Sequence, residues 1–147
     1  MRETLSYREN IVRDIMSSIK SIRAVRFVSR DVFELDELSD AQFPAILIQS
    51  GSELKTDICM GYSRQGTIEY VLTGFVKGKQ LDTARNTLVD SLEEKIYEDI
   101  TRNGYALDTQ ITEINTDEGV IFPLGAIQMI VRVEYTHPAG DLDKTVS

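Results

Sequence analysis

The chain has 147 residues, of which 41% are hydrophobic and 27% are charged, and its formal net charge is −8. This composition indicates one folded globular domain over residues 1–147 and excludes a chain that is disordered throughout. An acidic chain repels nucleic acid, and no apolar run reaches the roughly 20 residues of a membrane-spanning helix, so we expect neither direct nucleic-acid recognition nor a membrane partner.

The start of the chain leads straight into an amphipathic segment. Residues 1–4 lack the apolar core of a secretion signal, which predicts a protein made and kept in a cytoplasm. Apolar side chains then recur at helical spacing, so we expect a helix over residues 7–22. Ser6 and Glu9 fit a capping box at the first turn of this helix.

Basic side chains gather in and just after this predicted helix. They are Arg13, Lys20, Arg23, Arg26 and Arg30. We interpret the cluster as a solvated helix edge, and the alternative is a strip that binds phosphate or a partner.

The middle of the chain predicts strands separated by polar segments. Residues 24–29 predict a short strand, and the acidic residues 31–40 predict a loop with a helical turn. The apolar residues 43–49 begin with Phe-Pro, which suits the start of a strand because proline lacks an N–H group. Residues 52–66 are polar and contain glycine, so we expect a loop or a mobile hairpin tip. Residues 67–77 alternate and predict a strand with one buried and one partly covered face.

The last third of the chain predicts a second amphipathic helix and two strands. Apolar side chains fall at steps of three and four over residues 81–100, and Gly104 stands where a left-handed helix cap is expected. Strands are expected over residues 106–115 and 126–137, and the polar tail at 138–147 is expected to be loose. Two helices with one apolar stripe each can cover one face of a mostly antiparallel sheet, so we predict this α+β fold.

The sequence contains no recognisable catalytic constellation. The one histidine, His137, ends the last strand without an orienting partner in view, and the one cysteine, Cys59, lies in a polar segment without a neighbouring base. A single cysteine also excludes an internal disulfide and a cysteine-rich zinc site. Adjacent acids such as Asp117 and Glu118 lack the spaced ladder and glycine of a calcium loop. We therefore expect a structural protein, with no catalytic, cofactor-binding or metal site.

Four segments of the chain follow one another in an order that is shared with a known family of proteins. They are the helix over residues 7–22, Phe-Pro-Ala-Ile-Leu-Ile-Gln-Ser-Gly-Ser-Glu at 43–53, Tyr-Val-Leu-Thr-Gly-Phe-Val-Lys-Gly at 70–78 with the second helix directly after it, and Val-Arg-Val-Glu-Tyr at 131–135. This series resembles the tail terminator, or tail completion, proteins of long-tailed bacteriophages, over most of the chain.

The resemblance implies a virion protein that performs no covalent chemistry. Such proteins form a ring, commonly a hexamer, at the head-proximal end of the tail tube, where they end tube polymerisation and present a surface for joining the head. The expected partners are further copies of the chain, the tail tube protein and the head-completion or connector protein. The expected location is the virion tail, after assembly in the host cytoplasm. Two alternatives stay open, namely a head–tail connector or other minor tail protein, and a small α+β ligand-binding domain or enzyme.

Candidate contacts between subunits, or with the tube, lie outside the regular apolar stripes. The candidates are Phe33, Leu35, Tyr62, Arg64, Gln65, Asp117, Glu118 and Phe122. For the apolar members of this set, the alternative is local core beneath a loop.

Overall fold

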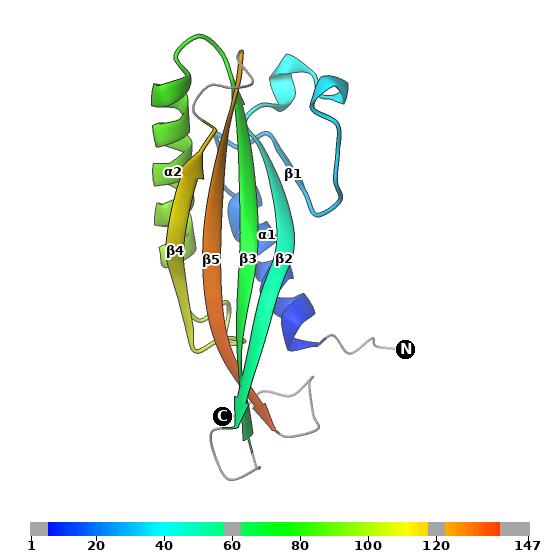
Figure 1. Ribbon diagram of the computed structural model, residues 1–147, viewed down its shortest axis with the longest axis vertical. Helices are drawn as coiled ribbons and strands as arrows, with labels where there is room; N and C mark the ends of the chain where they lie inside the picture. Colours follow the sequence, from blue (N-terminus) through cyan, green and yellow to red (C-terminus); the bar gives the residue numbers. More distant parts are fainter. Residues whose placement is uncertain (1–5, 58–62, 118–122, 139–147) are drawn as a thin grey trace.

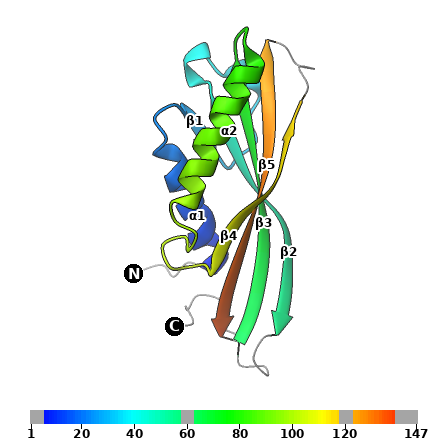
Figure 2. The same cartoon turned by 90° about the vertical axis from the view of Figure 1, so that its left-hand side faces the viewer.

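The computed structural model describes residues 6–57, 63–117 and 123–138. Two helices cover one face of a five-stranded sheet (Figures 1 and 2), with the strand order β1-β2-β3-β5-β4. The elements are α1 Tyr7–Lys20, β1 Phe27–Ser29, β2 Ala45–Asp57, β3 Ser63–Lys77, α2 Leu81–Tyr97, β4 Asp108–Thr116 and β5 Leu124–Pro138. All neighbouring strands are antiparallel except β1, which runs parallel to β2. The predicted α+β class, with two helices on one face of a mostly antiparallel sheet, is confirmed.

The core lies between the helical layer and the sheet. Its buried side chains come from both helices and from the inward faces of β2, β3 and β5, including Ile11, Ile15 and Ile19 of α1, Leu88, Leu92 and Ile96 of α2, and Leu72, Met129 and Val131 of the sheet. The two predicted helical stripes therefore form the packing interface that the spacing indicated.

The predicted end of the second helix is wrong. The helix ends at Tyr97 with Glu98 as its C-cap, so Ile100 lies beyond it and is 43% exposed. Gly104 does have a positive φ of 89°, but it belongs to a separate turn in which Arg102 and Asn103 also have positive φ. Three consecutive residues in the left-handed region, rather than one capping glycine, turn the chain towards β4.

Of the two predictions for residues 52–66, the loop is wrong, because the segment consists mainly of strand at the end of the β2–β3 hairpin. β2 continues to Asp57 and β3 begins at Ser63, so only residues 58–62, which include Cys59, lie outside the described part of this hairpin. Figure 2 shows that β2, β3 and β5 extend well past the end of the helical layer. Polar residues suit this portion because no helix covers it there.

An irregularity in β2 attaches this extension to α1. The register of β2 against β3 shifts between Ser50 and Glu53, which turns Glu53 towards the helical side of the sheet. The Glu53 carboxylate accepts hydrogen bonds from Arg8 Nε at 2.6 Å, from Arg8 Nη2 at 2.8 Å and from the Tyr135 hydroxyl at 3.1 Å. A Cβ atom on Gly66 would lie 2.3 Å from the Tyr135 ring, so the glycine lets this ring lie flat on β3.

The first turn of α1 forms only half of the predicted capping box. Ser6 Oγ accepts a hydrogen bond from the Glu9 N–H at 3.2 Å, as predicted. The Glu9 carboxylate instead accepts hydrogen bonds from Arg13 Nε at 2.9 Å and from Arg30 Nη1 at 2.6 Å. Two cations compete better for this carboxylate than a backbone N–H group does.

The Glu9 ion pairs predict a shifted titration. Hydrogen bonds from Arg30 and Arg13 lower the pKa of the Glu9 carboxyl from 4.5 to about 2. Because this pKa is lower in the folded protein than in the unfolded chain, the pairs contribute stability above pH 4.5 that is lost as the pH falls towards 2. We expect a carboxyl NMR titration to place the Glu9 midpoint near the lower value, and Arg30→Gln to raise it. The control Arg26→Gln, at an exposed position, should leave it unchanged, and an unshifted midpoint in the wild type would contradict the pairing.

Candidate interaction surface

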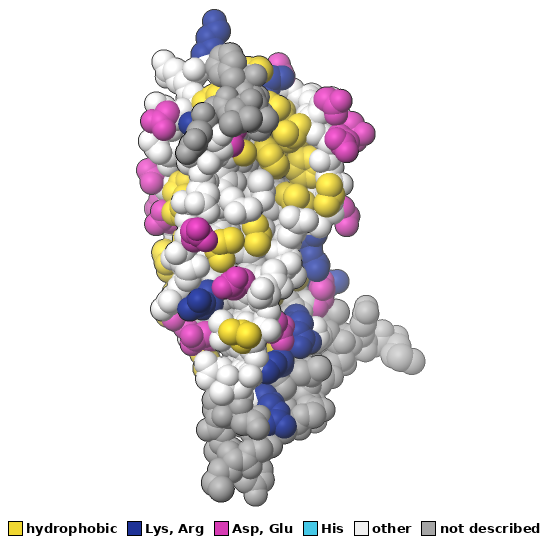
Figure 3. All heavy atoms as spheres, in the orientation of Figure 1, with side chains coloured by type: hydrophobic (Ala, Val, Ile, Leu, Met, Phe, Trp, Pro, Cys, Tyr) yellow, Lys and Arg dark blue, Asp and Glu magenta, His cyan; other side chains and the backbone are white. Residues whose placement is uncertain are grey.

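One face of the sheet carries no helix. Side chains alternate along each strand, so the residues between the core positions point to this uncovered face. On β3 they include Val71 and Phe75, and neighbouring positions on β2 and β5 hold Leu47 and Ile130. All four are partly exposed. Figure 3 views the molecule from this side and shows apolar side chains gathered towards one end of it.

That end is hollowed into a groove, which we call the strand-end groove. Residues 32–43 arch over the ends of β2 and β3 and enclose a volume of about 840 Å³. Its apolar lining consists of Val32, Phe33, Leu35, Leu38, Phe43, Leu47, Phe75, Pro123 and Leu124, and its polar lining of Glu34, Asp36 and Lys77. The groove can therefore bind apolar groups, and its ionisable lining offers two carboxylates and one amine.

Aromatic packing and one ion pair hold the arch in place. The Phe33 ring packs edge-on against Phe27 and Phe75, with centroid distances of 5.2 and 5.9 Å. The Lys77 ammonium lies 2.5 Å from an Asp40 carboxylate oxygen and 5.8 Å from the centre of the Phe43 ring. The groove is thus preformed by contacts at both ends of the arch.

The rim of the groove is acidic. Glu34, Asp36 and Glu37 are exposed, and none of them forms an ion pair within the part of the chain that the structure describes. In Figure 3 acidic side chains border the apolar patch along its outer edge. The Lys77 ammonium is already paired with the Asp40 carboxylate, so the rim has a net negative charge.

The structure brings two of the predicted interface residues together. Phe33 and Leu35 both line the strand-end groove. Asp117 lies at the same end of the sheet, but its carboxylate is 3.1 Å from Arg85 Nη1, and both side chains are largely buried. Asp117 therefore ties the end of β4 to α2 within the subunit.

The remaining predicted interface residues are not at the groove. Arg64 and Gln65 lie on β3 at the opposite end of the sheet, in the extension beyond the helices. Tyr62, Glu118 and Phe122 lie outside the described residues. The predicted set therefore does not form one surface.

The prediction missed three side chains that form the floor of the groove, Phe43, Leu47 and Phe75. All three belong to segments that the sequence predicts as strands. The alternation of residues 67–77 did predict a partly covered second face on that strand, and this was the signal that could have identified Phe75. Nothing in the sequence indicated that residues 32–43 would cross this face.

The structure brings no candidate catalytic or metal-binding residues together within the part of the chain that it describes. Among residues 6–57, 63–117 and 123–138, no group of three histidine, cysteine, aspartate or glutamate side chains could hold a metal ion. Cys59 lies outside the described residues, and only the backbone of His137, at the end of β5, is described. No helix in the described part of the chain is long and apolar enough to cross a membrane.

No family model matches the chain, and no curated protein sequence matches it. Among solved structures, the chain is similar to a chain of the virion of a native gene transfer agent particle, with 7% sequence identity and a TM-score of 0.43. The similarity covers 90% of this chain and 92% of that chain. It is a distant likeness of overall architecture.

Proposed function

We propose that the chain is a structural protein of a phage-like virion that forms a ring at the head-proximal end of a tail tube. The ring would end tube polymerisation and offer the surface that joins the head. The sequence resemblance to tail terminator proteins supports this proposal. The structural observation that carries it is the presence of one basic and one acidic group of side chains that form no ion pairs among the described residues.

A group of exposed basic side chains lies at the end of α1. Lys20 ends α1, and Arg23 and Arg26 lie in the turn that leads to β1. All three are exposed, and none forms an ion pair within the described residues. We call these three residues the basic flank. The turn lies against α2, since Ala24 lines one pocket with Thr87 and Ser91 of that helix, and it leads on to β1.

A group of acidic side chains lies on α2. Asp90, Glu93 and Glu94 lie on the outer part of α2, and none of them forms an ion pair in the part of the chain that is described. We call these residues the acidic flank. α2 packs over β3, β4 and β5, so this flank lies towards the β4 side of the sheet. Figure 3 shows acidic side chains along this side.

Two flanks of opposite charge allow copies to associate head to tail. The acidic flank of one copy can face the basic flank of the next, and a head-to-tail contact that closes on itself makes a ring. Two sheet edges also remain unpaired within the described residues, β4 on one side and β2 beyond Leu47 on the other. Such edges can add contacts between neighbouring copies.

The features at the two ends of the molecule's long axis support the same arrangement. The strand-end groove lies at one end of this axis and the β2–β3 extension at the other (Figure 1). If copies meet through their flanks, these two features lie on opposite faces of the ring. A protein that joins a tube to a head needs two such different faces.

A second candidate function is supported by the groove itself. Its volume of about 840 Å³ and apolar lining are in the range of small-molecule sites, which favours a ligand-binding domain. This function predicts a monomer that binds an apolar ligand. A head–tail connector would also form a ring, but on DNA-filled heads rather than on tails.

The proposal is tested by the molar mass of the protein from light scattering after gel filtration. The measurement covers a concentration series, with and without tail tubes from the same particle. We expect a ring of about six subunits, either free or at tube ends. A monomer that ignores tubes at every concentration would contradict the proposal and would favour the ligand-binding domain.

A further inference from the structure

We propose that the strand-end groove receives a segment of a partner protein in which apolar side chains are flanked by lysine or arginine. The identity of that partner as the tube or connector protein rests on the proposed function, whereas the chemistry of the segment rests on the groove alone.

The floor and mouth of the groove indicate that the partner segment carries apolar side chains. Val32 is 74% exposed at the mouth, and Leu35 and Leu38 are only partly covered. Together with Phe43 and Phe75 they present contiguous apolar surface to water. A contiguous exposed apolar patch with a polar rim is typical of a protein interaction site.

The rim of the groove indicates that the partner segment also carries lysine or arginine. Glu34, Asp36 and Glu37 supply three carboxylates without ion pairs in the described chain, while the lining cation, Lys77, is held by Asp40. A partner segment with lysine or arginine beside its apolar anchors would pair with these carboxylates at the edge of the groove. An acidic segment would be repelled, and an uncharged ligand would leave the rim unused.

The arch is also suited to bind without rearrangement. Phe33 is held between two other rings, and the ion pair of Lys77 with Asp40 fixes the far end of the arch. A preformed site loses little conformational entropy when its ligand binds.

The test measures the affinity of a fluorescent twelve-residue peptide in which leucine and lysine alternate, by fluorescence anisotropy. Two control peptides replace either every lysine by glutamate or every leucine by serine. We expect binding of the leucine–lysine peptide only. The triple variant Glu34→Gln, Asp36→Asn, Glu37→Gln should weaken this binding by about tenfold or more, and Val32→Ser should weaken it as well.

A matched triple variant separates the groove from general attraction to an acidic protein. Asp82→Asn, Glu98→Gln and Glu113→Gln remove the same number of charges at exposed positions away from the groove. We expect this variant to bind the peptide as the wild type does. An equal loss in both triple variants, equal binding of the glutamate peptide, or no binding at all would overturn the inference. The molar mass of the groove variant tests the ring separately, because the groove lies outside both flanks.

Discussion

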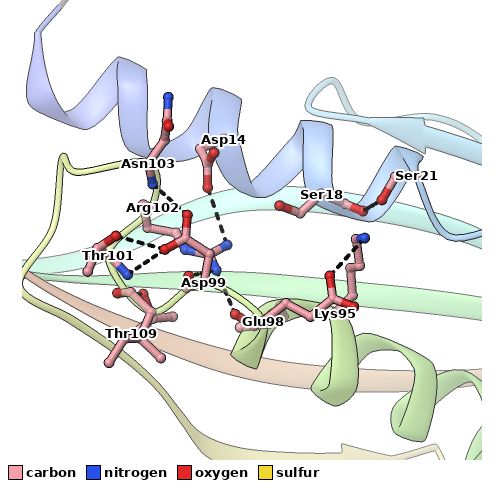
Figure 4. A network of polar contacts seen from close by, with 12 residues as sticks. Asp14, Ser18, Ser21, Lys95, Glu98, Asp99, Thr101, Arg102, Asn103 and Thr109 are labelled. Carbon is pink, nitrogen blue, oxygen red and sulfur yellow. Dashed lines mark hydrogen bonds and ion pairs between the residues drawn. The ribbon is translucent and has the colours of Figure 1, made fainter.

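Replacing Arg102 with alanine is expected to lower the free energy of unfolding by about 3–5 kcal/mol. The Arg102 side chain is fully buried in the turn after α2 (Figure 4). Its guanidinium donates hydrogen bonds to the Ile96 carbonyl oxygen at 2.6 Å and to the Asp99 carbonyl oxygen. It also lies 3.4 Å from an Asp14 carboxylate oxygen on α1.

The expected loss of stability is large because Arg102 is the partner of two backbone carbonyl groups and of the Asp14 carboxylate. The last carbonyl groups of a helix lack partners within it, and Arg102 supplies donors at the end of α2. The Arg102 side chain is fully buried and that of Asp14 is 22% exposed, and this burial lowers the pKa of Arg102 and raises that of Asp14. Alanine would leave the Asp14 charge without its partner, the carbonyl groups without donors and a cavity behind.

The measurement is urea denaturation followed by circular dichroism, with Arg132→Ala as the matched control. Arg132 is 44% exposed and its guanidinium lies 3.9 Å from Glu69, so its removal should cost less than about 1 kcal/mol. Equal losses in the two variants would show that the Arg102 network does not stabilise the junction of α1 and α2.

Neither this network nor its position could be predicted from the sequence. Arg102 lies in a polar turn between helix and strand, where an arginine is ordinarily solvated. Its burial depends on the approach of Asp14, 88 positions earlier in the chain, to the end of α2. No local pattern encodes that approach.

The regular elements were predictable because their periodicity reflects burial directly. The stripe of α1 is apolar at helical spacing because one side of this helix faces the sheet, and the inward side chains of β5 alternate for the same reason. The pattern fails where strands leave the core. Residues 52–57 are polar because this stretch lies beyond the helices, so a rule based on apolar alternation assigns a loop.

The candidate surface could be predicted only in part. Phe33 and Leu35 stood out because they are apolar in an acidic stretch without helical or strand spacing. The alternation of residues 67–77 set Phe75 apart from the core face, whereas the floor residue Leu47 lies in a continuous apolar run whose two faces look alike in sequence. The sequence indicates the basic flank in part, because Lys20, Arg23 and Arg26 belong to a basic cluster for which partner binding is one of two interpretations.

The second large effect concerns assembly. Reversing the basic flank with Lys20→Glu, Arg23→Glu and Arg26→Glu gives a chain with two acidic flanks, which is expected not to assemble. Like charges brought face to face cost roughly several kcal/mol, and the cost is largest at low salt. Reversing the acidic flank with lysines gives a chain with two basic flanks, which fails for the same reason. Five of the six positions are exposed and Glu93 is partly exposed, so folding should be retained.

The two variants should assemble with each other. The reversed basic flank of one faces the reversed acidic flank of the other, and the remaining wild-type flanks also match. An alternating ring can close with an even number of subunits, as the expected hexamer has.

The molar mass of this mixture is the most direct test that copies of the chain join head to tail through opposite flanks. Light scattering should give a monomer for each variant alone and a particle with the wild-type ring mass for the equimolar mixture. Rings from either variant alone, or monomers in a mixture made from chains whose wild type forms rings, would contradict this account.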